Sequence, residues 1–182
     1  MPRRVIQYNS IGKLNHWLSA VVVIGLFILG LWMVELDYYS SWYQVAPHWH
    51  KSIGLCLVFF TLFRLGWKLL TPHPAIQGKR WEIITAQTVH QLLYLLLFIL
   101  FVSGYLISTA DGRSIAVFNW FSIPGAGELF ADQADIAGMV HYYTALALIS
   151  LAGLHALAAL KHHFIDRDNT LKKMIGGVKD EN

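Results

Sequence analysis

The sequence predicts an all-α integral membrane protein, a four-helix bundle with both termini on the cytoplasmic side. Of its 182 residues, 55% are hydrophobic and only 14% are charged, whereas about a quarter of a soluble domain is charged. The hydrophobic residues also gather in four blocks, each with the roughly 20 residues needed to cross a bilayer. We expect one transmembrane domain over 1–182, with spans near 14–36, 49–70, 89–108 and 139–163.

Each span is bounded by a signal of its own. The first follows two arginines, but it is longer than the apolar region of a signal peptide and no small-residue cleavage site follows it, so we expect it to be retained. The second ends before Pro72 and Pro74, which break helices. The third leads into the longest connection, 111–138, which holds Pro124 and four glycines. Basic residues follow the fourth.

Lysine and arginine are distributed unevenly about these spans. With four spans, 12 of the 14 fall on one side, namely Arg3, Arg4, Lys13, Arg64, Lys68, Lys79, Arg80, Lys161, Arg167, Lys172, Lys173 and Lys179. Only Lys51 and Arg113 fall on the other side. Because cytoplasmic loops carry the excess of basic residues, both termini are expected in the cytoplasm. The net charge of +3 is too small to indicate a nucleic-acid partner.

Histidines lie inside the spans, where an imidazole without a partner is costly and therefore marks a functional site. His141 and His155 are 14 residues apart in the fourth span, which returns to nearly the same helix face after about 21 Å. At equal depth, His16 of the first span faces His155, and His50 of the second span faces His141. The sequence therefore predicts two imidazole pairs, one in each leaflet.

Such pairs are typical of b-type haem, whose iron takes axial imidazoles from opposite faces without covalent attachment. The sequence has no C-x-x-C-H motif, which excludes c-type attachment. Zinc is the main competitor, but it prefers four ligands at one depth, often with carboxylate or thiolate. No carboxylate falls inside an expected span, and the single cysteine, Cys56, lies in an apolar block. Haem therefore fits the pattern better than zinc.

Three further residues have two interpretations each. Arg64 shares the helix face of His50 at the opposite depth, and either pairs with haem propionates or extends to the membrane surface. His162 lies seven residues after His155 and either acts at the mouth of that pocket or is simply interfacial. Gly54 is expected to serve helix packing, with close haem approach as the other interpretation.

Several segments together carry a resemblance to a known family. They are Asn15–Trp17, His50–Gly54, His90–Tyr94, Gly153–His163 and the tail Phe164–Leu171. With them, nearly the whole chain resembles the prokaryotic cytochrome b561 family. The resemblance implies a four-helix cytochrome b of the bacterial inner membrane with two haems b. It assigns His16 and His155 to the cytoplasmic-side haem, and His50 and His141 to the periplasmic-side haem.

The resemblance also implies an activity, the passage of electrons from superoxide on the periplasmic side to ubiquinone, with His90 and His162 at the quinone site. Acidic residues in the outer connections (Glu35, Asp37, Asp111, Glu128, Asp132 and Asp135) would repel anionic superoxide, whereas Lys51 beside His50 supplies a local positive field. We therefore expect electron transfer from a periplasmic donor, superoxide or a protein, to membrane quinone. The alternative is a membrane-anchor and electron-relay subunit that serves a periplasmic redox protein.

Overall fold

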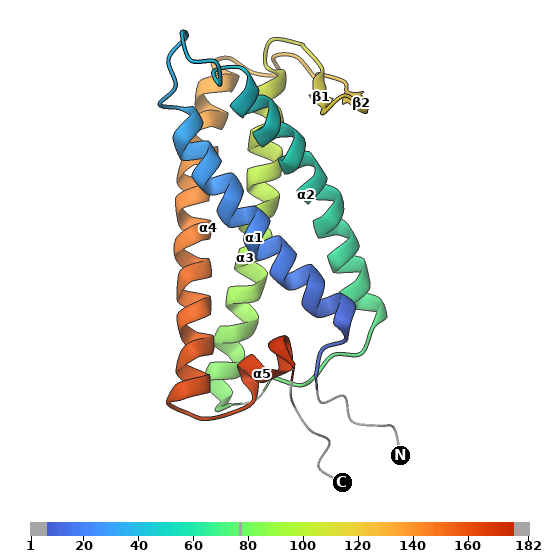
Figure 1. Ribbon diagram of the computed structural model, residues 1–182, viewed down its shortest axis with the longest axis vertical. Helices are drawn as coiled ribbons and strands as arrows, with labels where there is room; N and C mark the ends of the chain where they lie inside the picture. Colours follow the sequence, from blue (N-terminus) through green and yellow to red (C-terminus); the bar gives the residue numbers. More distant parts are fainter. Residues whose placement is uncertain (1–6, 77, 177–182) are drawn as a thin grey trace.

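The computed structural model describes residues 7–76 and 78–176 and is dominated by four long helices (Figure 1). They are α1 (Ser10–Met33), α2 (Val45–Leu70), α3 (Arg80–Thr109) and α4 (Gln133–Phe164). All four are long and apolar enough to cross a membrane, which confirms the expected spans. Arg3, Arg4 and Lys179, which contributed to the charge count, lie outside the described residues.

The helices are longer than the apolar blocks that predicted them. α3 begins at Arg80 rather than near residue 89, and α4 begins at Gln133 rather than near residue 139. Hydropathy detects only the lipid-facing part, whereas polar turns extend a helix when its first N–H groups are satisfied. At the start of α3, the Glu82 carboxylate accepts the Lys79 N–H at 2.8 Å. This extension places an acidic side chain on α3, where none was expected.

Two short elements were not predicted, and one of them departs from an all-α fold. β1 (Ile115–Val117) and β2 (Phe121–Ile123) form an antiparallel hairpin in the third connection. The buried Ser52 hydroxyl of α2 accepts the Phe118 N–H at 2.8 Å, which ties the hairpin to α2. The other element is α5 (Thr170–Ile175). Three-residue strands and a single helical turn carry too little periodicity to be read from sequence.

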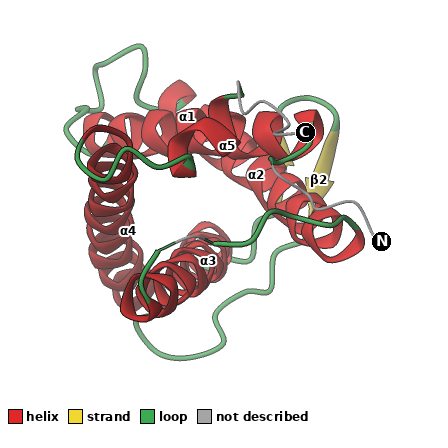
Figure 2. Ribbon diagram, turned by 90° about the horizontal axis from the view of Figure 1, so that it is seen from below, coloured by secondary structure: helices red, strands yellow, loops and turns green. Residues whose placement is uncertain are grey.

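The four helices form two pairs. α3 packs along α4 and α1 packs along α2, while contacts between the two pairs are few, and the view along the bundle shows this arrangement (Figure 2). α5 lies across one end of the bundle, where the Tyr8 N–H donates to the Lys173 carbonyl at 3.3 Å. We call this the terminal end, and the opposite one, which carries β1 and β2, the hairpin end.

An apolar layer fills the middle of the bundle. Its buried residues are Leu57, Leu97 and Leu148, and partly buried neighbours from α1 and α3 pack against them: Val22, Val23, Leu26, Leu93, Leu96, Leu100 and Phe101. Most other large hydrophobic side chains on the four helices are exposed, as expected for surfaces that face lipid. Leu148 lies seven residues from both His141 and His155, so this layer separates two histidine levels.

Candidate functional site

At the hairpin end, α2 and α4 bring His50 and His141 together. The ring centroids are 6.2 Å apart and the ring planes are inclined by 70°. Each imidazole is half-buried and comes from a different helix pair. The two side chains therefore face one another across the boundary between the pairs.

At the terminal end, α1 and α4 bring His16 and His155 together in nearly the same geometry. These centroids are also 6.2 Å apart, with the ring planes inclined by 71°. The second pair also joins the α1–α2 pair to the α3–α4 pair. The spacing of 14 residues in α4 thus produces two similar imidazole pairs at two levels.

This geometry fits a metal ion held between two imidazoles. Metal–imidazole bonds of about 2 Å on opposite sides of one ion place the ring centres roughly 6 Å apart, and both pairs have that separation. The donor set is also suitable, because two axial imidazoles are a usual ligation of b-type haem. The residues therefore fit two haem irons.

Each imidazole at the hairpin end lies against a glycine of the neighbouring helix. A Cβ at Gly30 of α1 would lie 3.2 Å from Cε1 of His50, and a Cβ at Gly104 of α3 would lie 3.2 Å from Cε1 of His141. Both distances are tighter than ordinary van der Waals contacts. Glycine therefore allows each ring to lie directly on a helix backbone.

A hydroxyl holds one of these two rings. The buried Ser103 Oγ donates to the Ile99 carbonyl at 2.7 Å and lies 3.1 Å from Nδ1 of His141. Because its single proton is used, Ser103 accepts from an N–H at Nδ1, which leaves Nε2 of His141 for a metal. Nδ1 of His50 is buried and has no hydrogen-bond partner of good geometry among the described residues.

Arg64 lies inside the terminal-end site rather than at the lipid surface. Its Nη2 is 3.0 Å from Nδ1 of His16, and its guanidinium carbon lies 5.6 Å from the centre of the Tyr94 ring. A guanidinium only donates, so Nδ1 of His16 accepts here and the neutral ring carries its proton on Nε2. Coordination through Nε2 therefore requires Arg64 to release Nδ1, which would free the guanidinium for another anion or acceptor.

The structure places His90 and His162 at different levels. The His90 ring lies 5.1 Å from the His155 ring, so His90 adjoins the terminal-end pair. His162 lies in the last turn of α4, where its Nδ1 is 2.7 Å from Asp168 and 3.1 Å from Asp166. The two histidines flank the same end of the bundle without any contact between them in the described residues.

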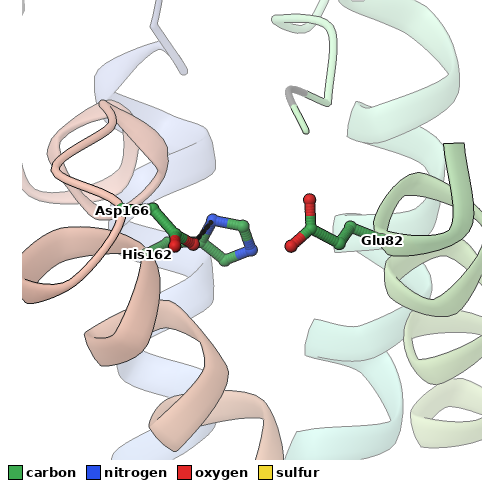
Figure 3. Close-up of side chains that lie close together, drawn as sticks. All are labelled: Glu82, His162 and Asp166. Carbon is green, nitrogen blue, oxygen red and sulfur yellow. Dashed lines mark ion pairs between the residues drawn. The ribbon is translucent and has the colours of Figure 1, made fainter. Parts of the chain in front are cut away.

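His162 belongs to a cluster with Glu82 and Asp166, whose ligand-type atoms lie within 4.8 Å of one another (Figure 3). The Lys161 ammonium already lies among these carboxylates, 2.6 Å from Asp166 and 3.1 Å from Glu82. An ammonium and a metal cation compete for the same oxygens. The cluster is therefore a satisfied ion-pair network between α3, α4 and the turn after α4.

The sequence analysis missed Gly30, Gly104 and Ser103, although a signal for the glycines was present. Gly30 lies 14 residues after His16, and Gly104 lies 14 residues after His90. The same spacing that paired the histidines on α4 thus marks the opposite level on α1 and α3. The expectation that Gly54 packs against a helix was wrong, since a Cβ there would meet no described atom within 4 Å.

Comparison with known proteins agrees with this geometry. Residues 7–177 match the prokaryotic cytochrome b561 family. Cytochrome b561 homolog 2 of Escherichia coli (strain K12) is 46% identical over 172 residues, which cover 93% of this chain and 92% of that protein. A Yersinia pestis protein named "Probable superoxide oxidase CybB" is 32% identical over 167 residues, covering 88% and 90% of the two chains.

Proposed function

Because the chain belongs to the prokaryotic cytochrome b561 family, we propose that it is a di-haem protein that passes electrons from a periplasmic donor to membrane quinone. Membership of this family makes it a multi-pass bacterial membrane protein with haem b that functions in transmembrane electron transfer. The two haems, the donor, the quinone and the residue roles belong to the proposal.

The observation that carries the proposal is the repeated separation of 6.2 Å between paired imidazoles. His50 and His141 would hold one haem b, and His16 and His155 the other. When bound, haem b supplies reversible one-electron chemistry, and two axial imidazoles leave no open iron position for binding oxygen. The protein's own contribution is to orient the ligands, exclude water and place the two sites at different depths.

The orientation follows from charge. The terminal end carries most lysine and arginine residues, so we place it in the cytoplasm and the hairpin end in the periplasm. The whole chain then forms one transmembrane cytochrome b domain. Arg64, which contacts His16 at 3.0 Å, would pair with the propionates of the cytoplasmic-side haem once it has released that ring.

Quinone reduction would take place at the cytoplasmic end, beside His90 and His162. Conversion of one ubiquinone to ubiquinol consumes two electrons and two protons, so the site needs a proton donor. Histidine titrates nearest neutral pH and suits that role. His90 adjoins His155 and His162 lies close to the terminal-end surface, so these two residues are the candidates.

The donor is either superoxide or a protein. Two superoxide anions, each oxidised to dioxygen, would supply the two electrons, and the relative from Yersinia pestis with a name that refers to superoxide oxidase supports this choice. Lys51 would attract the anion beside His50, against the acidic outer connections. The second candidate is an electron-relay subunit, which those acidic connections favour because they would dock a basic periplasmic protein.

Haem quantitation tests the ligand assignment. Purified protein should contain two haems b, and replacing any one of His16, His50, His141 or His155 by Ala should remove about one haem, because no other side chain can replace an axial ligand supplied by a rigid helix. His48→Ala is the matched control, since residues two apart on a helix point in nearly opposite directions. One haem per chain, or none, would refute the di-haem proposal.

Stopped-flow mixing tests the donor and acceptor. Superoxide should reduce the haems rapidly and ubiquinone should reoxidise them, with slower reoxidation in His90→Ala and His162→Ala. If superoxide leaves the haems oxidised while a periplasmic redox protein reduces them, the relay role holds instead. Unchanged reoxidation in both variants would remove both histidines from the reaction.

A further inference from the structure

The turn that follows α4 folds back onto His162. The Asp168 N–H donates to the His162 carbonyl at 3.1 Å, and Oδ2 of Asp168 lies 2.7 Å from Nδ1 of His162. Its other oxygen accepts the Thr170 N–H at 2.7 Å. Arg167 adopts a left-handed backbone with φ 56°, which a side chain rarely adopts without support. Asp168 is thus fixed at three points, one of which is an imidazole.

The charge of Asp168 determines which nitrogen of His162 carries the proton. Partial burial raises the pKa of this carboxyl, but the Thr170 and His162 hydrogen bonds outweigh burial and bring the pKa below its usual value of 3.8. An ionised carboxylate only accepts hydrogen bonds. Nδ1 of His162 must therefore be the donor, and it is also within 3.1 Å of Asp166. This leaves Nε2 as the nitrogen that gains and loses a proton.

Nε2 points away from the turn. In Figure 3 one ring nitrogen of His162 lies toward Asp166, and the other faces Glu82 across the gap between α4 and α3. The Glu82 carboxylate is already bonded to the Lys79 N–H at 2.8 Å and to Lys161 at 3.1 Å. Glu82 is thus fixed as well, and Nε2 of His162 faces the boundary between the two helices.

We propose that Asp168 is a positioning residue that holds His162 with its proton on Nδ1, so that Nε2 delivers a proton to quinone. This inference rests on the proposed function. In the step, the Nε2–H bond of the imidazolium breaks and an O–H bond forms on a quinone oxygen that has received an electron from the periplasmic donor. Nδ1–H remains bonded to Asp168, and a proton from cytoplasmic water restores the imidazolium. Two such events complete one quinol.

The charged groups around His162 come from three elements. Lys161 precedes it on α4, Asp166 and Asp168 lie on the turn, and Glu82 reaches it from α3. Three carboxylates face one ammonium, so the imidazolium formed in each cycle has anionic partners on both sides of its ring. The exposed Asp166 connects this cluster to water.

Asp168→Asn tests the assignment with a change of one atom. The amide oxygen can still accept the Thr170 N–H, but the amide nitrogen cannot accept from Nδ1 of His162. We expect at least a tenfold slower reoxidation by ubiquinone-1 at pH 7, since general acid–base catalysis contributes about 100-fold to 10,000-fold. The pH profile of the rate should shift, and Asp168→Glu should restore part of it.

Asp166→Asn is the matched control, because its contact with His162 is longer, at 3.1 Å against 2.7 Å, and should matter less. Haem content and the rate of reduction by the donor should stay unchanged in every variant. A rate loss in Asp168→Asn without a shift in the pH profile, or without rescue by Glu, would show a merely structural role and overturn the inference.

The His162→Ala variant distinguishes this failure from failure of the proposed function. If His162→Ala reoxidises at the normal rate, the proton donor of the proposed function is wrong. If His162→Ala is slow while Asp168→Asn behaves like the unmodified protein, His162 keeps its role and only the positioning by Asp168 is refuted.

Discussion

The imidazoles of His50 and His141 lie with their centroids 6.2 Å apart, although 91 residues separate them in the chain. The same separation recurs between the pair at the other end of the bundle. Leu148 lies between the two levels and is almost fully buried, so an apolar layer keeps the levels apart. The bundle therefore presents two similar sites at different depths rather than one large cavity.

The glycines that carry the hairpin-end imidazoles should not tolerate a methyl group. In Gly30→Ala and Gly104→Ala the new Cβ would lie 3.2 Å from an imidazole carbon, so the ring must move by a few tenths of an ångström. We expect weaker haem retention at the hairpin end, with up to one of two haems lost on purification. Pyridine-haem assay and thermal melting of the Soret band measure it.

Gly25→Ala is the control for that experiment, since it lies on the same helix and its Cβ would meet no described atom within 4 Å. There the methyl group should be neutral or stabilising by up to about 1 kcal/mol, because alanine favours helix more than glycine does. Equal haem loss in Gly25→Ala would mean that the effect is general to helix glycines.

Removal of the Ser103 hydroxyl should loosen His141. Ser103→Ala takes away the acceptor at 3.1 Å from Nδ1, and loss of such a partner typically weakens metal binding by about 10-fold to 100-fold. Haem transfer to apomyoglobin measures the change as faster release of one haem. Ser19→Ala is the matched control, because Ser19 is also buried and donates to a helix carbonyl but contacts no imidazole. Similar release rates in the two variants would contradict the role of Ser103.

Loss of the Arg64 charge should make the terminal-end haem harder to reduce. The guanidinium lies 3.0 Å from His16, and a positive charge favours the reduced site, which carries one positive charge fewer. Over roughly 10 Å at an effective dielectric constant near 20, the loss is about 1–2 kcal/mol. In Arg64→Gln, redox titration should show one midpoint potential lowered and the other unchanged. Arg113→Gln, an exposed change at the hairpin end, should lower neither.

The turn after α4 should lose stability in acid. The pKa of Asp168 is lowered in the folded protein, so its stabilising contribution is present above the unfolded value, about 3.9. That contribution is lost as pH falls through the lower folded value. Hydrogen-exchange protection factors for 165–176 should therefore decrease between pH 5 and pH 2.5. In Asp168→Asn this step should be absent, and its persistence would assign it to another carboxyl.

Much of this arrangement was predictable from periodicity. The spacing of His141 and His155, seen against the length of a membrane span, predicted two imidazole levels on one helix face. Arg64 was placed at the depth of His16 by the same arithmetic, and the structure shows the two in contact. Periodicity succeeds here because a rigid helix converts a count of residues directly into depth and direction.

Other features depended on contacts between distant segments. Nothing in the local sequence marks Ser103 as a partner of His141, since a serine within a helix usually bonds to its own helix. Glu82 was assigned to a break because charged residues lower hydropathy, although they extend a helix when capped. The bond between Asp168 and His162 arises from a left-handed turn at Arg167, which no spacing rule predicts.

By itself, the sequence determined the number of spans, the histidines inside them and the two depths, since hydrophobic length and helical rise are local properties. Only the tertiary structure decided which helices adjoin, which nitrogen of His141 and His162 meets a partner, and where glycine leaves room for a ring. Those features depend on the approach of separate helices, where a few tenths of an ångström determine whether an atom fits or forms a hydrogen bond.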